Sequence, residues 1–186
     1  PLWTSDGTAG GTFALAGADV FTLCAPPAKL GNAAFFLIED PSSQEQNQEV
    51  WRGDGTPGGA FPITRLAPDR VALGLGTAGD RLVIFVQEIA SGGTELWTSD
   101  GTAAGIFLLV DACPGECSSN PVPVAVTPRG VFFNTFGSSQ EARNGLWITR
   151  GTPASTELLA EDVQAGGGAS AVWMASQGVL YFGGFD

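Results

Sequence analysis

The sequence predicts an all-β fold built from repeated small antiparallel sheets. The segment Leu-Trp-Thr-Ser-Asp-Gly-Thr occurs at residues 2–8 and again, identical, at residues 96–102, with degenerate copies at 50–56 and 146–152. Short apolar runs rich in β-branched and aromatic residues separate the copies, and 27 glycines and 12 prolines suit a chain with many turns. A period in the forties, carried by such runs, indicates an array of small sheets.

The unit that contains the second identical copy shows the order of elements best. Residues 71–75 and 81–89 predict two strands, and the second ends at a Ser-Gly-Gly turn. Residues 94–99 predict a third strand and residues 106–110 a fourth, with the hairpin turn at Asp100-Gly101 between them. Glycine accepts a positive φ there, and the aspartate carboxylate accepts hydrogen bonds from nearby backbone N–H groups. Each unit therefore holds four antiparallel strands.

The other units follow the same order, with apolar runs at residues 33–38 and 130–134 before their Leu-Trp or Val-Trp pairs. Strands such as 83–86 are apolar at every position, whereas a sheet with one solvated face alternates. Both faces must then be covered. Radially stacked sheets achieve this because each lies between two neighbours, so we predict a β-propeller. Leu and Trp of each pair then point to opposite faces.

The two ends of the sequence complement each other. Residues 171–174 and 179–182 predict the first two strands of a unit, and residues 2–5 and 12–15 supply the third and fourth. We therefore expect one β-propeller domain over residues 1–186, with four blades of four strands and a ring closed by N- and C-terminal strands in one blade. The alternative is part of a larger propeller. The expected units cover about residues 19–67, 68–112, 113–162, and 163–186 together with 1–18.

Composition argues against several functions. The net charge is −11, from 19 acidic and 8 basic side chains, so a phosphate backbone is repelled and no nucleic-acid partner is expected. No apolar run approaches the roughly 20 residues of a membrane-spanning helix. The absence of histidine removes Ser-His-Asp and Cys-His catalysis. We expect no catalytic residue and no cofactor, although carboxylate pairs leave glycosidase-type chemistry open.

The cysteines and acidic loops are the residues that could form a disulfide or bind a metal. Cys113 and Cys117 flank a Pro-Gly turn, which favours a local disulfide over reduced thiols and, last, over a metal site. Cys24 has no evident partner in the sequence and suits a small buried apolar position. Calcium in the acidic loops or a central channel stays open, but the sequence has no Asp-x-Asp-x-Asp-Gly loop and the metal ligands stay unknown.

The stretch at residues 94–105 reads Thr-Glu-Leu-Trp-Thr-Ser-Asp-Gly-Thr-Ala-Ala-Gly, and Asp111 and Pro114-Gly115 follow it. It resembles the ELWxxDGT repeat of bacterial proteins, often secreted or surface-associated, whose arrays are thought to form β-propellers. The resemblance implies an extracytoplasmic location and no agreed activity. The fourth copy departs from the pattern, with Arg150 in place of Asp and Ser155 in place of Gly, so a site with four equivalent carboxylates is not expected.

The repeat positions predict structural rather than ligand-binding roles. The tryptophans are expected to pack between or within blades and the aspartates to brace turns, at Trp3, Trp51, Trp97, Trp147, Trp173, Asp6, Asp54 and Asp100. Recognition is expected in the variable loops before the Leu-Trp pairs, with solvated connections that bind no partner as the alternative, at Gln44, Glu45, Gln46, Asn47, Gln140, Glu141, Arg143 and Asn144. We expect a non-catalytic module that binds a protein or self-assembles, within a larger surface complex. The alternative is a carbohydrate-binding or carbohydrate-active propeller that uses acidic loop residues.

Overall fold

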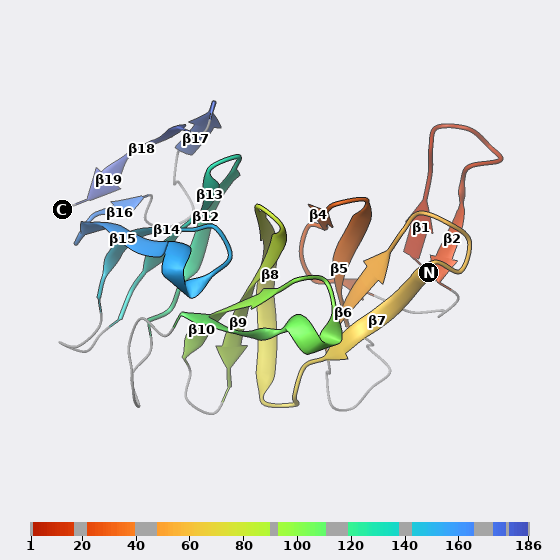
Figure 1. Cartoon of the computed structure of the whole chain (residues 1–186), viewed down its shortest axis with the longest axis horizontal. Coiled ribbons are helices and arrows are strands. Elements are labelled where there is room, and N and C mark those ends of the chain that lie inside the picture. Colours follow the sequence, from red (N-terminus) through yellow and green to blue (C-terminus); the bar gives the residue numbers. More distant parts are fainter. Residues whose placement is uncertain are drawn as a thin grey trace.

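A computed structural model of the chain describes residues 2–16, 22–39, 48–89, 93–110, 119–137, 143–165, 173–177 and 179–185. These residues are strands and turns, with two short 3-10 helices at Ala103–Gly105 and Pro153–Ser155. Successive sheets follow one another along the long axis, and the two chain ends lie at opposite ends of it (Figure 1). The all-β prediction is confirmed, and the described residues do not form a closed ring.

Three full sheets make up the middle of the molecule, and every strand pairing in them is antiparallel. In the first, β5 (Ala33–Glu39) pairs with β3 (Thr22–Leu23) and β4 (Ala28–Leu30) on one side, and β6 (Gln48–Gly53) and β7 (Ala60–Arg65) follow. The second contains β8 (Arg70–Ala78), β9 (Arg81–Glu88), β10 (Thr94–Ser99) and β11 (Phe107–Val110) in that order. The third contains β12 (Val122–Thr127), β13 (Gly130–Thr135), β14 (Gly145–Thr149) and β15 (Thr156–Glu161).

Shorter pairings occupy the two ends of the described chain. The N-terminal hairpin pairs β1 (Leu2–Thr4) with β2 (Phe13–Ala16). Near the C-terminus, β17 (Trp173–Ser176) pairs with β18 (Val179–Phe182), and β16 (Gln164–Ala165) pairs with β19 (Gly184–Phe185). The strands that begin each unit contact one another in succession, β4 with β8, β8 with β12 and β12 with β17.

The repeat extends to the register of the strands. In every unit, the pairing between the third and fourth strands shifts between the Leu or Val and the Trp that follows it. These shifts fall at Leu2/Trp3, Val50/Trp51, Leu96/Trp97 and Leu146/Trp147. A bulge of this kind bends a strand and changes where its side chains point, so the motif sets a local geometry as well as a pair of apolar side chains.

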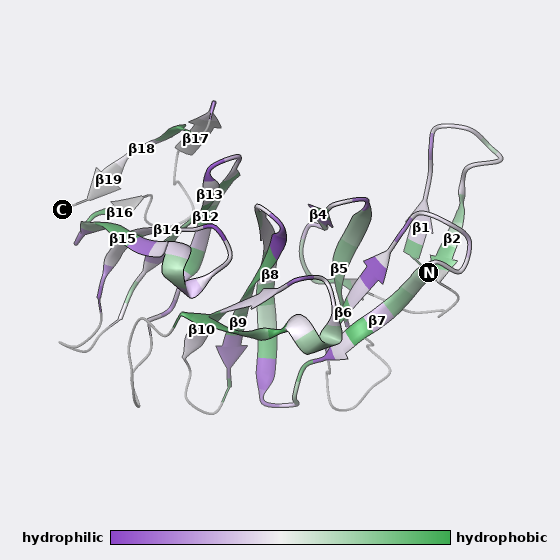
Figure 2. Cartoon of the chain, viewed as in Figure 1, coloured by the Kyte–Doolittle hydropathy of each residue, from purple (hydrophilic) through white to green (hydrophobic). Residues whose placement is uncertain are grey.

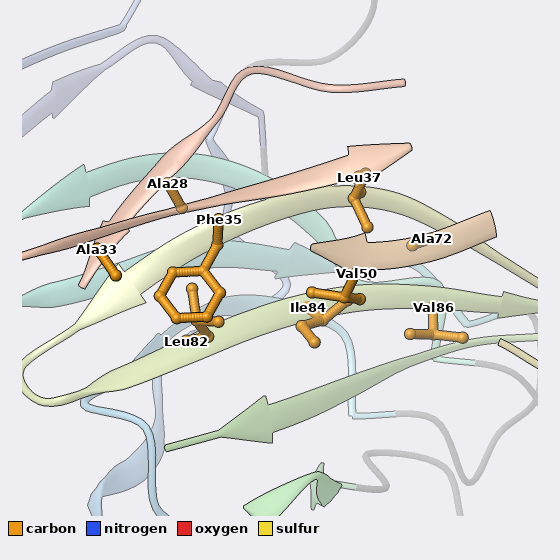
Figure 3. Packing of buried hydrophobic residues seen from close by; sticks show 9 residues of the cluster. All are labelled: Ala28, Ala33, Phe35, Leu37, Val50, Ala72, Leu82, Ile84 and Val86. Carbon is orange, nitrogen blue, oxygen red and sulfur yellow. The ribbon is translucent and has the colours of Figure 1, made fainter. Parts of the chain in front are cut away.

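The core lies between the sheets, and hydrophobic residues run along the middle of the strands that enclose it (Figure 2). Leu96 packs with Phe85 and Phe133 between the second and third sheets. Trp97 packs on the opposite side of its sheet, against the cluster that contains Leu37 and Ile84 between the first and second sheets (Figure 3). Leu and Trp of this pair therefore face different neighbours, as predicted.

Trp3 departs from the prediction that all the repeat tryptophans pack between sheets. Trp147 is 4% exposed, and Trp51 and Trp97 are partly buried, but Trp3 is 60% exposed. Within the described ranges, the hairpin of β1 and β2 packs on a neighbouring sheet through one face, where Leu2 and Leu15 pack with residues of β5. Trp3 is therefore left in solvent. The side chain of Trp173 lies outside the described residues.

Candidate functional site

The Asp-Gly-Thr turns join the third and fourth strands, and their aspartates serve the turn itself. Oδ1 of Asp6 accepts hydrogen bonds from the backbone N–H of Thr8 at 2.9 Å and from its hydroxyl at 2.7 Å. The same two bonds occur at Asp54 with Thr56 and at Asp100 with Thr102, at 2.9 and 2.6 Å in each case. Each intervening glycine has a φ between 83° and 90°. These carboxylates satisfy backbone donors that the tight turn leaves without partners.

The fourth turn replaces two residues of this arrangement together. In the other turns, a Cβ on the glycine five residues after the aspartate would collide with the carboxylate, at Gly11, Gly59 and Gly105. In the fourth turn Arg150 removes that carboxylate, so Ser155 fits at the glycine position. The Ser155 hydroxyl then accepts a hydrogen bond from the backbone N–H of Thr152 at 3.3 Å, which replaces the missing aspartate. The two departures from the repeat are therefore one coupled change.

The turn bonds also fix the charge state of the aspartates. The threonine hydroxyl first, and the threonine backbone N–H second, hold the pKa of Asp6, Asp54 and Asp100 below the ordinary value for aspartate. A lowered pKa means that the folded state favours the ionised carboxyl more than the unfolded state does.

Stability should therefore fall in acid because of these turns. Their contribution is complete above the unfolded-state pKa of about 3.9 and is lost as the pH falls through the lower folded-state values. We expect the melting temperature of the protein to drop below about pH 4. The variant Asp54→Asn should show a smaller drop over the same range in thermal scans followed by circular dichroism, with Asp69→Asn as the exposed control outside the turns. Identical pH profiles for the two variants would contradict the assignment.

An open groove of about 610 Å³ lies where turns of the first and second sheets meet. Its polar lining combines the guanidinium of Arg52 with three carboxylates, Asp54, Asp80 and Asp100, over an apolar floor that includes Phe35. Oδ1 of Asp54 and of Asp100 is engaged in the turns, whereas Asp80 is exposed on the rim. Such a groove suits a polar, uncharged or cationic ligand.

The groove brings carboxylates together without a metal-ligand group or a histidine. No group of three or more His, Cys, Asp or Glu side chains that could hold a metal ion occurs within the described ranges. The sequence has no histidine to act as a base or ligand. Calcium therefore stays a prediction without a ligand set among these residues.

The predicted partner-binding loops are described only in part. Gln44, Glu45, Gln46, Asn47, Gln140 and Glu141 lie outside the described residues. Asn144 bridges the ends of its loop, because its side chain accepts from the backbone N–H of Gly137 at 2.6 Å and donates to the Gly137 carbonyl at 2.9 Å. The guanidinium of Arg143 lies 5.2 Å from the ring centre of Trp147. Both side chains therefore contact other residues of the protein, Gly137 and Trp147.

Of the three cysteines, the structure describes only Cys24. Cys113 and Cys117 lie outside the described residues. Cys24 carries a partly buried thiol that packs against the core between the first and second sheets, and its Sγ lies 3.8 Å from a carboxylate oxygen of Glu39. Burial first, and the Glu39 charge second, raise the pKa of this thiol, so it stays protonated and unreactive at neutral pH.

Fold and turns together define a repeat protein of four-stranded antiparallel sheets. No family model, curated protein or solved structure matches the chain. In the part of the chain that the structure describes, no helix is long and apolar enough to cross a membrane.

Proposed function

We propose that this protein is a β-propeller of the ELWxxDGT type that serves as a non-catalytic, extracytoplasmic assembly or protein-binding module. In the finer architecture of this proposal, the three full sheets are whole blades. The N-terminal hairpin and the C-terminal pairings are two halves of a fourth blade. The alternative architecture is part of a larger propeller.

The observation that supports this architecture is an equivalence of register between the first and last units. In the first unit, Thr22 pairs with Glu39, six residues after β5 begins at Ala33. In the last unit, Gln164 pairs with Phe185, six residues after β18 begins at Val179. The C-terminal pairings therefore repeat the start of the first unit strand for strand, and a third and fourth strand like β1 and β2 would complete them.

The non-catalytic assignment follows from how the polar residues are used. The three repeat carboxylates are hydrogen-bonded in turns, and the Asn144 and Arg143 side chains contact Gly137 and Trp147. The described surface also exposes large apolar side chains, and Trp3, Leu159 and Tyr181 are each about half exposed. Exposed apolar groups of this size are typical of interaction surfaces.

Native mass spectrometry tests the proposal. We expect protein from its source to appear as a complex, either at a multiple of 19.1 kDa or with a second polypeptide, and to keep that mass after treatment with a chelator. Recombinant chain at the same concentration serves as the control for partners from the source. A bare monomer in both samples would contradict an assembly module, and a mass lost to chelator would direct attention to a bound cation.

The groove beside Arg52 favours a carbohydrate-binding function as a second candidate. Asp and Arg side chains that line one groove over an apolar floor can hydrogen-bond sugar hydroxyls. The test is glycan binding by the unmodified chain and by Asp80→Asn, whose side chain lies on the groove rim, with Asp69→Asn as the control. This candidate requires a bound glycan whose affinity falls in the first variant only.

A further inference from the structure

Three of the four repeat tryptophans, Trp51, Trp97 and Trp147, lie against two apolar residues of the preceding unit. Trp51 packs with the cluster that contains Leu2 and Leu15. Trp147 packs with Leu96 and Leu109 in the same way. In both units the two residues are 13 positions apart, one on the third strand and one on the fourth. We call such a pair a tryptophan slot, and Val50 with Ile63 forms the slot beside Trp97.

Among the described residues, the fourth pair of this kind has no tryptophan against it. Leu146 and Leu159 have the same 13-residue spacing and line a groove of about 350 Å³ together with Phe182 of β18. Leu159 is 47% exposed, whereas its equivalents Leu15 and Leu109 are 4% and 3% exposed because tryptophans cover them. The repeat tryptophan that lacks a slot is Trp3, which is 60% exposed.

The strand edges beside the slot and beside Trp3 are complementary. Within the described residues β18 pairs only with β17, and β1 pairs only with β2. In each full sheet, the Trp pairs with the residue three positions after the first residue of the second strand, in the pairs Phe36 with Trp51, Ile84 with Trp97 and Phe133 with Trp147. The same register places Trp3 opposite Phe182 and Thr4 opposite Tyr181.

The surroundings of the turn glycines support the same joint, by which we mean the contact between the β1 edge and the β18 edge. A Cβ at Gly101 would lie 3.0 Å from Phe35 in the preceding sheet, and one at Gly151 would lie 3.2 Å from the carbonyl oxygen of Ala78. The equivalent positions Gly7 and Gly55 have nothing within 4 Å. Gly7 lies in the β1–β2 hairpin of the incomplete blade and Gly55 in the sheet that follows it, so each turn lacks neighbours that the missing strands and the sheet before them would supply.

We propose that the slot is filled by β1 of a second copy of this chain, and that β1 of the first copy fills the second copy's slot in return. The two copies then form a head-to-tail ring of eight blades. Each chain contributes three whole blades, and the remaining two blades are shared between the chains. This inference rests on the proposed function, and it names the partner of the assembly.

The arrangement of the sheets favours a second copy over the chain's own N-terminus. The hairpin of β1 and β2 packs on the first sheet, and β18 packs on the third, so the full sheets hold the two edges at opposite ends of the molecule (Figure 1). Bringing them together within one chain would bend every packed interface between them, and close-packed cores resist such deformation. A second copy reaches both edges without any change, and a head-to-tail contact that closes gives a ring.

Mixed single-cysteine variants test the proposal. In a chain with Cys24, Cys113 and Cys117 replaced by serine, Thr4→Cys and Tyr181→Cys are made separately, mixed and oxidised. We expect a covalent dimer of about 38 kDa, twice 19.1 kDa, on a non-reducing gel. The control mixes Thr4→Cys with Val179→Cys, two residues out of register and too distant for a disulfide, and should give at least about tenfold less dimer.

The other outcomes separate this inference from the proposed function. If the mixture gives no dimer while a chain that carries both Thr4→Cys and Tyr181→Cys forms an internal disulfide, the blade closes within one chain. That result overturns the second copy and leaves the propeller intact. If neither sample forms the disulfide, the shared blade itself is wrong.

A second measurement avoids cysteine chemistry. Light scattering on the unmodified protein should give twice the chain mass, and Trp3→Ala should raise the dissociation constant of the dimer about tenfold or more, as for a tryptophan at the centre of an interface. The control Phe107→Ala alters another exposed aromatic away from the joint and should leave the constant unchanged. Circular dichroism confirms that both variants fold.

Discussion

Replacing Phe133 with alanine is expected to lower the free energy of unfolding by about 3–5 kcal/mol. Phe133 is fully buried between the second and third sheets. Its ring stacks on Trp147 with centres 6.0 Å apart and meets the edge of Phe85 at 6.3 Å. Alanine leaves a cavity bounded by two sheets, and neither sheet can move into it without losing its own strand pairing. Urea unfolding followed by tryptophan fluorescence and circular dichroism measures the loss.

The matched control for this variant is Phe107→Ala on β11. Phe107 is exposed, so its removal should cost about 1 kcal/mol or less. A similar small loss for both variants would mean that the two sheets do not pack on each other through Phe133. The control thus separates the core between sheets from the intrinsic preference of phenylalanine for strands.

The full sheets were predictable because their apolar runs have no polar face. Residues 83–86 lie in β9 and are buried to 2% or less, as expected for a strand covered on both sides. The preceding strand is longer than predicted, since β8 extends over Arg70–Ala78 rather than 71–75. Gly74 and Gly76 hid this extra length, because glycine is not typical of strands. A Cβ at Gly76 would lie 3.2 Å from Val126, so this glycine allows the third sheet to approach closely.

The fate of Trp3 was not predictable from the motif. Residues 2–8 and 96–102 are identical, yet Trp3 is exposed and Trp97 packs against a core. The difference lies in the neighbouring sheet and not in local sequence. The exchange at Arg150 and Ser155, in contrast, was readable from the sequence. Loss of the aspartate carboxylate at Arg150 leaves room for a side chain five residues later, where the other three turns need glycine.

Gly151→Ala is the second substitution with a large expected effect. Gly151 has a φ of +90°, which costs an alanine about 1–2 kcal/mol. The added Cβ would also collide with the Arg81 side chain, whose Cγ lies 2.8 Å from that position, and would approach the carbonyl oxygen of Ala78 at 3.2 Å. Crowding in a packed region adds about 1–3 kcal/mol. We expect the sum of both costs in chemical unfolding.

Gly58→Ala separates the two costs. Gly58 also has a positive φ, +73°, but it is exposed and a Cβ there would meet nothing within 4 Å. It should lose only the conformational part. The excess loss in Gly151→Ala then measures the contact between the fourth Asp-Gly-Thr-like turn and the preceding sheet. That contact includes the Gly151 carbonyl, which lies 3.0 Å from the buried hydroxyl of Thr98. Equal losses would mean that this turn does not touch its neighbour, and the open surroundings of Gly7 and Gly55 would then no longer indicate missing strands.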